Sequence, residues 1–259
     1  MKKIRFKIFP TLVLLFLIIN HVSAQEKKIR FIGVETGMDF QGVGVPDYSF
    51  IRGQIASYPG NYYTAYNLRG NHQKWYGGVK AEMRSGNNHF GYLAGLRFTN
   101  IKSSIGKNIF TNDDPEYFYL LYKVEGTNTE YLKVKEINRA SQYIGIPLEF
   151  RVYPFKPRHF GLYFKASADF AYLIASHTDV AFYNDQMKVY EQDVADKFDA
   201  DSKFYSSLSF GVGWKIGRDA KPNLDLEASF PSFVLTSHTS GLVNTITGGG
   251  FQVNLLIPF

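Results

Sequence analysis

Segments of about ten residues in which apolar and polar side chains alternate recur along this chain, and they constrain its fold more than any other feature. Side chains on a β-strand point to opposite faces in turn, so each segment predicts a strand with one apolar and one polar face. Helical periodicity is hard to find after residue 25. Eight segments carry the alternation: Arg30 to Phe40, Lys74 to Arg84, Phe90 to Thr99, Tyr143 to Tyr153, Phe160 to Ile174, Phe204 to Ile216, Leu224 to Phe230 and Phe251 to Phe259.

After the first residue of each segment, the charged residues all fall on the face opposite to the apolar one. Because the apolar residues alone define the faces, the position of charge is a partly independent check. The polar faces carry thirteen charged residues, six basic and seven acidic: Glu35, Asp39, Lys80, Glu82, Arg84, Arg97, Glu149, Arg151, Lys165, Asp169, Lys215, Asp225 and Glu227. A soluble sandwich, whose two apolar faces meet, would give the same alternation.

The connections between segments separate the two architectures, since long and short connections alternate without exception. A membrane-spanning up-and-down barrel has this pattern, because tight turns close one rim and long loops extend from the other. A Greek-key sandwich gives no reason for it. The short links contain turn-forming residues, such as Ser85-Gly86-Asn87-Asn88 and Gly217-Arg218-Asp219. We therefore predict an all-β fold, an eight-stranded antiparallel up-and-down transmembrane β-barrel with long extracellular loops.

The N-terminus is typical of a secretory signal peptide. Four basic residues precede an apolar run from Ile8 to Ile19, which is too short to span a bilayer, and Val22-Ser23-Ala24 provides small residues for cleavage. Cleavage after Ala24 predicts a signal peptide at 1–24 and an outer-membrane β-barrel domain at 25–259. Without those four bases, 25 basic residues face 23 acidic ones, so net charge gives no reason to bind nucleic acid.

The chain ends on Phe259, which closes the last alternating strand. A terminal aromatic residue in this position resembles the C-terminal signal of bacterial outer-membrane barrels, which the barrel assembly machinery recognises. We therefore expect Phe259 to act as an assembly signal. Outer-membrane lipid and lipopolysaccharide are the expected surroundings of the barrel.

The run from Tyr143 to Phe150, with its Ile-Pro-Leu core, resembles a strand of the small outer-membrane β-barrel proteins of the Bacteroidota, the PorT-like family. Gly211 and Gly213 in the sixth segment and the aromatic terminus also fit that family, and the resemblance covers the mature chain. It implies a barrel fold and an outer-membrane location. Because the name-giving member takes part in type IX protein secretion, an accessory role in that process is an alternative function.

In a barrel of this size the inward side chains fill the interior, so an open channel is not expected. We interpret the thirteen inward charges as a lumen charge network that replaces an apolar core. A narrow pore through this network is the alternative, although unpaired charge there would be costly. Five aromatic residues are expected on the outer face near the two rims: Trp75, Tyr92, Phe160, Tyr172 and Trp214.

The long loops are the expected place of any function outside the membrane. The first loop is rich in tyrosine between Tyr58 and Tyr66, and the second contains a predicted hairpin, Phe118 to Val124 and Glu130 to Ile137. Exposed aromatic residues suit a contact with a protein or ligand, but they also pack on one another to order long loops. We interpret the third loop as a solvated acidic stretch rather than a calcium site: Glu191, Asp193, Asp196, Asp199 and Asp201.

Two Ser-His-Thr triplets, beginning at Ser176 and Ser237, raise a lipid A-modifying enzyme as a further alternative. Adjacent residues on a strand point to opposite faces, so a serine next to a histidine does not make a catalytic pair. The sequence has no glycine-rich phosphate loop and no zinc-ligand spacing. We therefore predict a protein without catalytic, cofactor or metal sites, which presents aromatic-rich extracellular loops to a protein or ligand partner.

Overall fold

The computed structural model describes residues 29–52, 68–85, 89–108, 115–125, 128–155, 159–218, 221–236 and 241–259. The predicted signal peptide, the first-loop tyrosines between Tyr58 and Tyr66 and the triplet at Ser237 lie outside these residues. No helix within the described ranges is long and apolar enough to cross a membrane.

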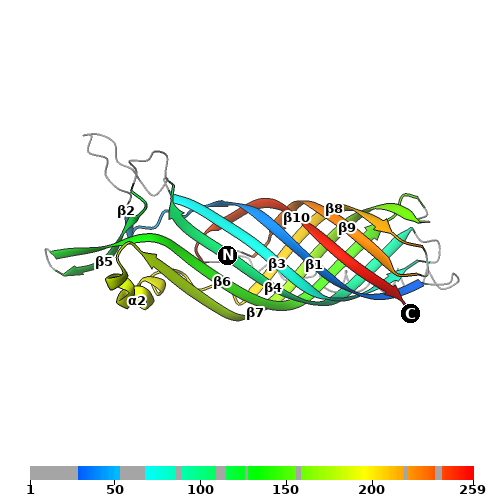
Figure 1. Cartoon of the computed structure of the whole chain (residues 1–259), viewed down its shortest axis with the longest axis horizontal. Coiled ribbons are helices and arrows are strands. Elements are labelled where there is room, and N and C mark those ends of the chain that lie inside the picture. Colours follow the sequence, from blue (N-terminus) through cyan, green and yellow to red (C-terminus); the bar gives the residue numbers. More distant parts are fainter. Residues whose placement is uncertain are drawn as a thin grey trace, which may run out of the picture.

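Ten strands make up most of the described chain: β1 (Ile29–Gly44), β2 (Ile51–Arg52), β3 (Leu68–Arg84), β4 (Phe90–Lys107), β5 (Phe118–Glu125), β6 (Asn128–Val152), β7 (Phe160–Phe182), β8 (Phe204–Ile216), β9 (Asn223–Val234) and β10 (Asn244–Pro258). Two helical turns, η2 (Asp185–Tyr190) and α2 (Glu191–Ala195), follow β7. Eight strands close into a ring in the order β6-β4-β3-β1-β10-β9-β8-β7, completed by the β6–β7 pair. All ring pairs are antiparallel, which confirms the predicted eight-stranded up-and-down barrel (Figure 1).

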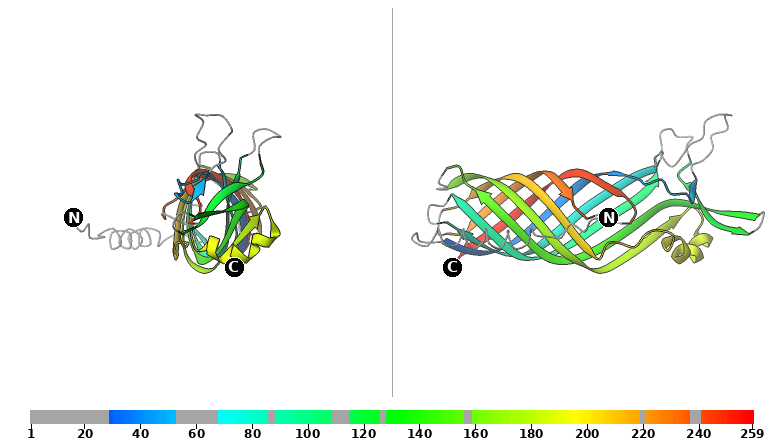
Figure 2. Two further views of the ribbon diagram at one scale, coloured as in Figure 1. Left: turned by 90° about the vertical axis from the view of Figure 1, so that its left-hand side faces the viewer. Right: turned by 180° about the vertical axis from the view of Figure 1, so that it is seen from behind.

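The two rims of the barrel differ. The described chain begins and ends at the rim with the short turns, where Phe31 pairs with Pro258 and the Phe259 N–H donates to the Arg30 carbonyl at 3.1 Å. The opposite rim carries β2, β5 and the helical turns, and there β6 and β7 continue beyond the ring (Figures 1 and 2). The hairpin expected in the second loop is confirmed, since β5 pairs with the first part of β6.

Several strands are longer than predicted, and the predicted boundaries were wrong for a physical reason. β6 begins at Asn128 rather than Tyr143, and β7 ends at Phe182 rather than Ile174. The prediction followed apolar alternation, which stops where the outward side chains become polar. Beyond Trp75, Phe98 and Ile144, the outward positions of β3, β4 and β6 include Gln73, Asn71, Lys102, Ser104, Gln142 and Asn138.

A belt of exposed apolar side chains surrounds the ring. On β6, for example, Ile144, Ile146 and Leu148 are 42%, 53% and 46% exposed. Such a surface is unfavourable in water but is the expected contact with hydrocarbon. Four of the five predicted outer aromatic residues are exposed and Tyr92 is half-buried: Trp75, Tyr92, Phe160, Tyr172 and Trp214.

Above this belt, the inward side chains of the wall become apolar and the outward side chains become polar. Lys135 has no partner on β7, because the β6–β7 register shifts between Val134 and Glu136. Beyond this bulge the even-numbered residues of β6 face inward, so Leu132 and Val134 become buried. They belong to an apolar cluster that fills the long-loop end: Ile51, Ile105, Phe118, Leu120, Leu132, Val134, Ile137, Val180, Phe182, Val194, Phe198, Leu242 and Val243.

Placing an arginine in the belt tests these facings. We expect Leu148→Arg and Val212→Arg each to cost about 2 to 4 kcal/mol of folding free energy, because a charge near the middle of the belt loses its water. Asn138→Arg is the matched control on β6, since Asn138 faces outward above the belt and is exposed. Heat-modifiable migration on gels measures folding in membranes. Normal folding of both belt variants would contradict the assigned facing.

Candidate functional site

The structure places all thirteen predicted lumen charges inside the barrel, each no more than 8% exposed. A fourteenth charge, Lys74, lies with them at 4% exposure. Sequence reasoning missed Lys74 because it stands at the edge of its segment, although its parity with Tyr76 and Lys80 was the available signal. With Lys74 the set holds seven bases and seven acids, so the buried charge is balanced.

Arg97 on β4 forms the centre of the part of this network that lies nearer the long-loop rim. Its guanidinium binds Glu35 on β1 in a bidentate manner, with N–O distances of 2.6 and 2.7 Å, and binds Asp169 on β7 at 2.5 Å. Lys80 on β3 lies 3.0 Å from Glu35 and 3.1 Å from Glu149, and Arg97 also lies 3.4 Å from Glu149. Apart from the Lys80–Glu35 and Arg97–Glu149 pairs, whose strands are neighbours, these contacts cross the lumen and connect strands that do not pair with each other.

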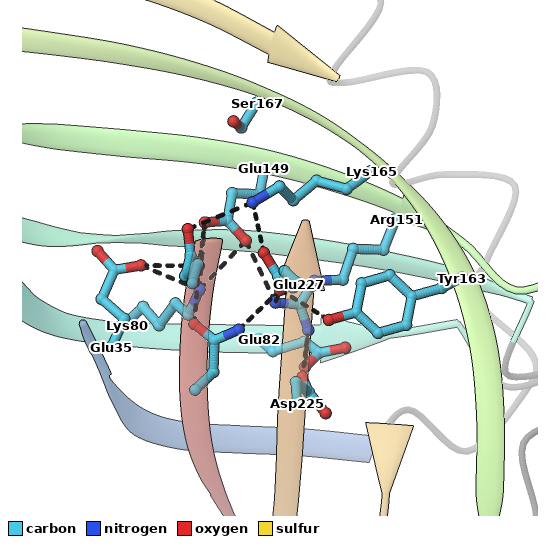
Figure 3. Close-up of polar contacts among 12 residues, drawn as sticks. Glu35, Lys80, Glu82, Glu149, Arg151, Tyr163, Lys165, Ser167, Asp225 and Glu227 are labelled. Atoms are coloured by element: carbon cyan, nitrogen blue, oxygen red, sulfur yellow. Dashed lines mark hydrogen bonds and ion pairs between the residues drawn. The ribbon is translucent and has the colours of Figure 1, made fainter. Parts of the chain in front are cut away.

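Arg151, one residue before the end of β6, is the centre of the network nearer the short-turn rim. Figure 3 shows it beside Tyr163 and Glu227. It pairs with Asp225 at 2.6 Å and with Glu227, both from β9, and Glu227 also binds Lys165 on β7. Glu149 lies 3.3 Å from Arg151 and so joins the two halves into one network. Every carboxylate here contacts a base, which is the arrangement that makes buried charge tolerable.

Tyrosine rings complete the interior. The Tyr76 ring packs where a side chain on Gly37 would otherwise lie, and the Tyr163 ring packs in the same way on Gly213. Each ring stacks under a guanidinium: Arg97 lies 4.3 Å from the Tyr76 centroid, and Arg151 lies 4.7 Å from the Tyr163 centroid. Their hydroxyls donate to Gln252 at 3.0 Å and Glu227 at 2.7 Å. The two glycines therefore make room for rings that orient the network's arginines.

A separate polar cluster lies between the network and the apolar cluster. Arg139 on β6 donates to the Asp199 carbonyl at 2.5 Å and pairs with Asp201 at 3.4 Å. The Tyr48 hydroxyl donates to the carbonyls of Gly241 and Leu242 at 3.1 and 2.8 Å. Burial raises the pKa of Tyr48 to about 12, so this phenol remains a neutral donor at physiological pH. The Arg139 bonds therefore attach the connection between β7 and β8 to the barrel wall, and the Tyr48 bonds join the connection after β1 to the one before β10.

The prediction of a solvated acidic stretch in the third loop was wrong for the buried Asp201 and holds in part for the half-buried Glu191, whereas Asp193, Asp196 and Asp199 are exposed. Asp201 is only 8% exposed and accepts hydrogen bonds from Ser141 and Ser176. Glu191 accepts the Val180 N–H at 2.9 Å, and Asp193 accepts the Tyr122 hydroxyl at 2.8 Å. These carboxylates fix the helical turns against β5 and β7, so their role in the fold is structural.

The triplet at Ser176 does not form a nucleophile–base pair. Ile174 on β7 has no partner on β6, and beyond this bulge Ser176 faces inward to bind Asp201 at 2.5 Å. His177 faces outward, where its imidazole lies 3.0 Å from Asp179. Among the described residues no group of three or more His, Asp or Glu side chains is arranged to hold a metal ion.

The ring, the belt and the charged lumen agree with the family that the sequence matches. Residues 23–232 match the family model of the outer membrane protein beta-barrel domain. The chain belongs to this family. Outer-membrane location follows for this beta-barrel domain, so the short-turn rim faces the periplasm and the long connections lie outside the cell.

Solved outer-membrane barrels are similar in architecture but distant in sequence. OprG of Pseudomonas aeruginosa is 10% identical over 90% of this chain and 94% of its own, with a TM-score of 0.41. Ail of Yersinia pestis is 10% identical over 90% of this chain and 99% of its own, with a TM-score of 0.37. The translocator domain of NalP from Neisseria meningitidis is 8% identical over 96% and 94%, with a TM-score of 0.33. No curated protein gave a match.

Removing one central base tests the balance of the lumen network. We expect Arg97→Met to destabilise the barrel by about 3 to 5 kcal/mol, because Glu35 and Asp169 lose their main partner inside the lumen. Urea unfolding in lipid vesicles measures this loss. The exposed Lys188→Met is the matched control, with an expected change within about 0.5 kcal/mol. Equal stability of the two variants would show that the network does not support the fold.

Proposed function

We propose that this protein is a non-enzymatic outer-membrane barrel that presents a rigid extracellular platform to a protein or ligand partner. The observation that carries this proposal is the apolar cluster above the lipid belt, which packs β2, β5, β6 and β7 outside the membrane. Insertion of the ring does not need this cluster, because hydrocarbon covers the belt. A platform ordered before binding loses less conformational entropy when a partner arrives.

The lumen network takes a structural role in this proposal. Arg84, Arg151, Lys215 and Asp225 have no accessible surface, so no water-sized space adjoins them. This supports a filled interior rather than the alternative of a narrow pore. The opposite facings of Ser176 and His177 support the absence of catalysis over the alternative of a lipid A-modifying enzyme.

The proposal includes the route by which the protein reaches the outer membrane. The N-terminal 24 residues are removed after Ala24 during export, and the barrel assembly machinery recognises the C-terminal strand. Phe259 is 73% exposed at the periplasmic rim, which supports its role as an assembly signal. Lipid and lipopolysaccharide then surround the belt, and nucleic acid is not a partner.

Cross-linking in intact cells tests the platform. The extension is the sheet of β5 and the parts of β6 and β7 that continue beyond the ring. We expect a photoreactive residue at Tyr131, which is 43% exposed on the extension, to yield adducts with an extracellular partner. The matched control is Phe155, an aromatic residue that is 76% exposed at the periplasmic rim. Mass spectrometry of the purified adducts identifies what is attached. Identical adducts at both positions, or none at Tyr131, would overturn the proposal.

The resemblance of the Ile144-Gly145-Ile146-Pro147-Leu148 strand to the PorT-like family of the Bacteroidota favours a second candidate, an accessory role in type IX protein secretion. Deleting the gene separates the two candidates. Under the platform proposal we expect the culture medium to contain the normal set of type IX cargo proteins. Retention of that cargo, restored by a plasmid copy of the gene, would instead assign the accessory role.

A further inference from the structure

The outward face of the extension carries aromatic and basic side chains side by side. We define the tyrosine–lysine face by six residues of β5, β6 and the segments flanking β5 and β7: Tyr117, Tyr119, Tyr131, Tyr183, Lys133 and Lys135. Register places these residues together, since Tyr119 pairs with Lys133 and the Tyr183 N–H donates to the Lys133 carbonyl at 2.9 Å.

The rings of this face form one connected surface. The Tyr117 centroid lies 5.5 Å from that of Tyr119 and 4.8 Å from that of Tyr183, and Tyr131 lies 6.3 Å from Tyr119. The opposite side of the same strands is the apolar cluster, where Phe118 and Val134 are fully buried. The face is therefore held rigid from behind, and its rings offer flat apolar area with phenolic hydroxyls at the edges.

Its two lysines differ from the charges of the lumen. The Lys133 ammonium lies 4.9 Å from the Tyr117 centroid, and the Lys135 ammonium lies 5.6 Å from the Tyr183 centroid. Neither ammonium forms an ion pair with a described residue, whereas the guanidiniums of Arg97 and Arg151 each contact several carboxylates. The tyrosine–lysine face is thus positively charged, and an anionic partner complements it.

The direction of the face indicates where that partner stands. On β6 the outward positions pass from the lipid belt at Ile144 to Lys133 along the same wall, so the face points sideways over the membrane. At about 3.3 Å per residue and a tilt of about 40°, this places the face roughly 25 to 30 Å above the belt. A phospholipid headgroup does not reach that height, but the saccharide chain of a neighbouring glycolipid does.

A polar hollow on the same wall lies between the belt and the face. Its volume is about 470 Å³, and its lining includes Asn71, Gln73, Lys102, Asn138 and Asp179. These exposed side chains offer both hydrogen-bond donors and acceptors. Such a mixture suits sugar hydroxyl groups, which donate and accept in turn.

We propose that the tyrosine–lysine face binds an acidic saccharide chain carried by a glycolipid of the outer leaflet. Sugar rings stack on the tyrosines through their C–H faces, and sugar carboxylate or phosphate groups pair with Lys133 and Lys135. This inference rests on the proposed function, for which it names the partner. A protein interface is less well matched, since the centre of such an interface is depleted of lysine.

The test uses the full barrel in phospholipid nanodiscs, titrated with oligogalacturonate as an acidic saccharide and maltooligosaccharide as a neutral one. We expect Lys133→Gln/Lys135→Gln and Tyr131→Ala each to weaken oligogalacturonate binding about tenfold. The double variant Lys188→Gln/Lys203→Gln removes the same charge from exposed positions elsewhere, and it should bind as the wild type does. Higher salt should weaken the wild type toward the level of the first double variant.

A second arm distinguishes the source of the saccharide. Lipopolysaccharide added to the nanodisc should be retained by the wild type and lost from Lys133→Gln/Lys135→Gln in native mass spectrometry. Equal retention by both, or equal affinity for acidic and neutral oligosaccharides, would overturn the inference. Tighter binding of an oligoglutamate peptide to the same face would also overturn it. That result would leave the proposed platform standing, whereas the platform itself fails only if Tyr131 yields no specific adduct in cells.

Discussion

The need to pair every backbone N–H and C=O group in hydrocarbon controls this structure. A sheet meets that need only when it closes, so the fold depends on the β6–β7 pair that joins the two ends of the strand order. Closure then decides what each face of every strand meets. The outward positions contact lipid, and the inward positions of eight strands meet in an interior that their own side chains fill.

The lumen network follows from that closure. Water does not solvate the inward side chains, because they are buried. The seven bases and seven acids must therefore neutralise one another across the lumen. A slip of one residue in any strand would move its charges to the lipid side, so the network also helps to fix the register. Glu35, Arg97 and Asp169 show this directly, because they come from three strands of which no two pair with each other.

The barrel could be predicted from the sequence because a closed barrel needs strands with one apolar and one charged face. Period-two alternation, with charge on one face, records this arrangement directly. It failed where that signal ends. Gln73 and Asn138 are outward residues in water, so the strands beyond the belt carried no apolar pattern. The bulges at Lys135 and Ile174 each change the parity of a strand by one residue. No period predicts such a change, and the inward facing of Ser176 and the burial of Asp201 depend on it.

The change of polarity on both faces above the belt explains how one continuous strand, β6, lies in lipid along one part and in water along another. Within the membrane β6 turns Leu148 outward and Glu149 inward, whereas in the extension it turns Lys133 outward and Val134 inward. The unpaired Lys135 between these regions changes which residues of the strand face inward, so that Leu132 and Val134 continue the apolar cluster that Ile137 begins. The ring anchors the sheet, and the sheet supplies its own apolar core. The outward surface of the sheet is therefore needed neither for anchoring in the membrane nor for the apolar core, and it is available for recognition.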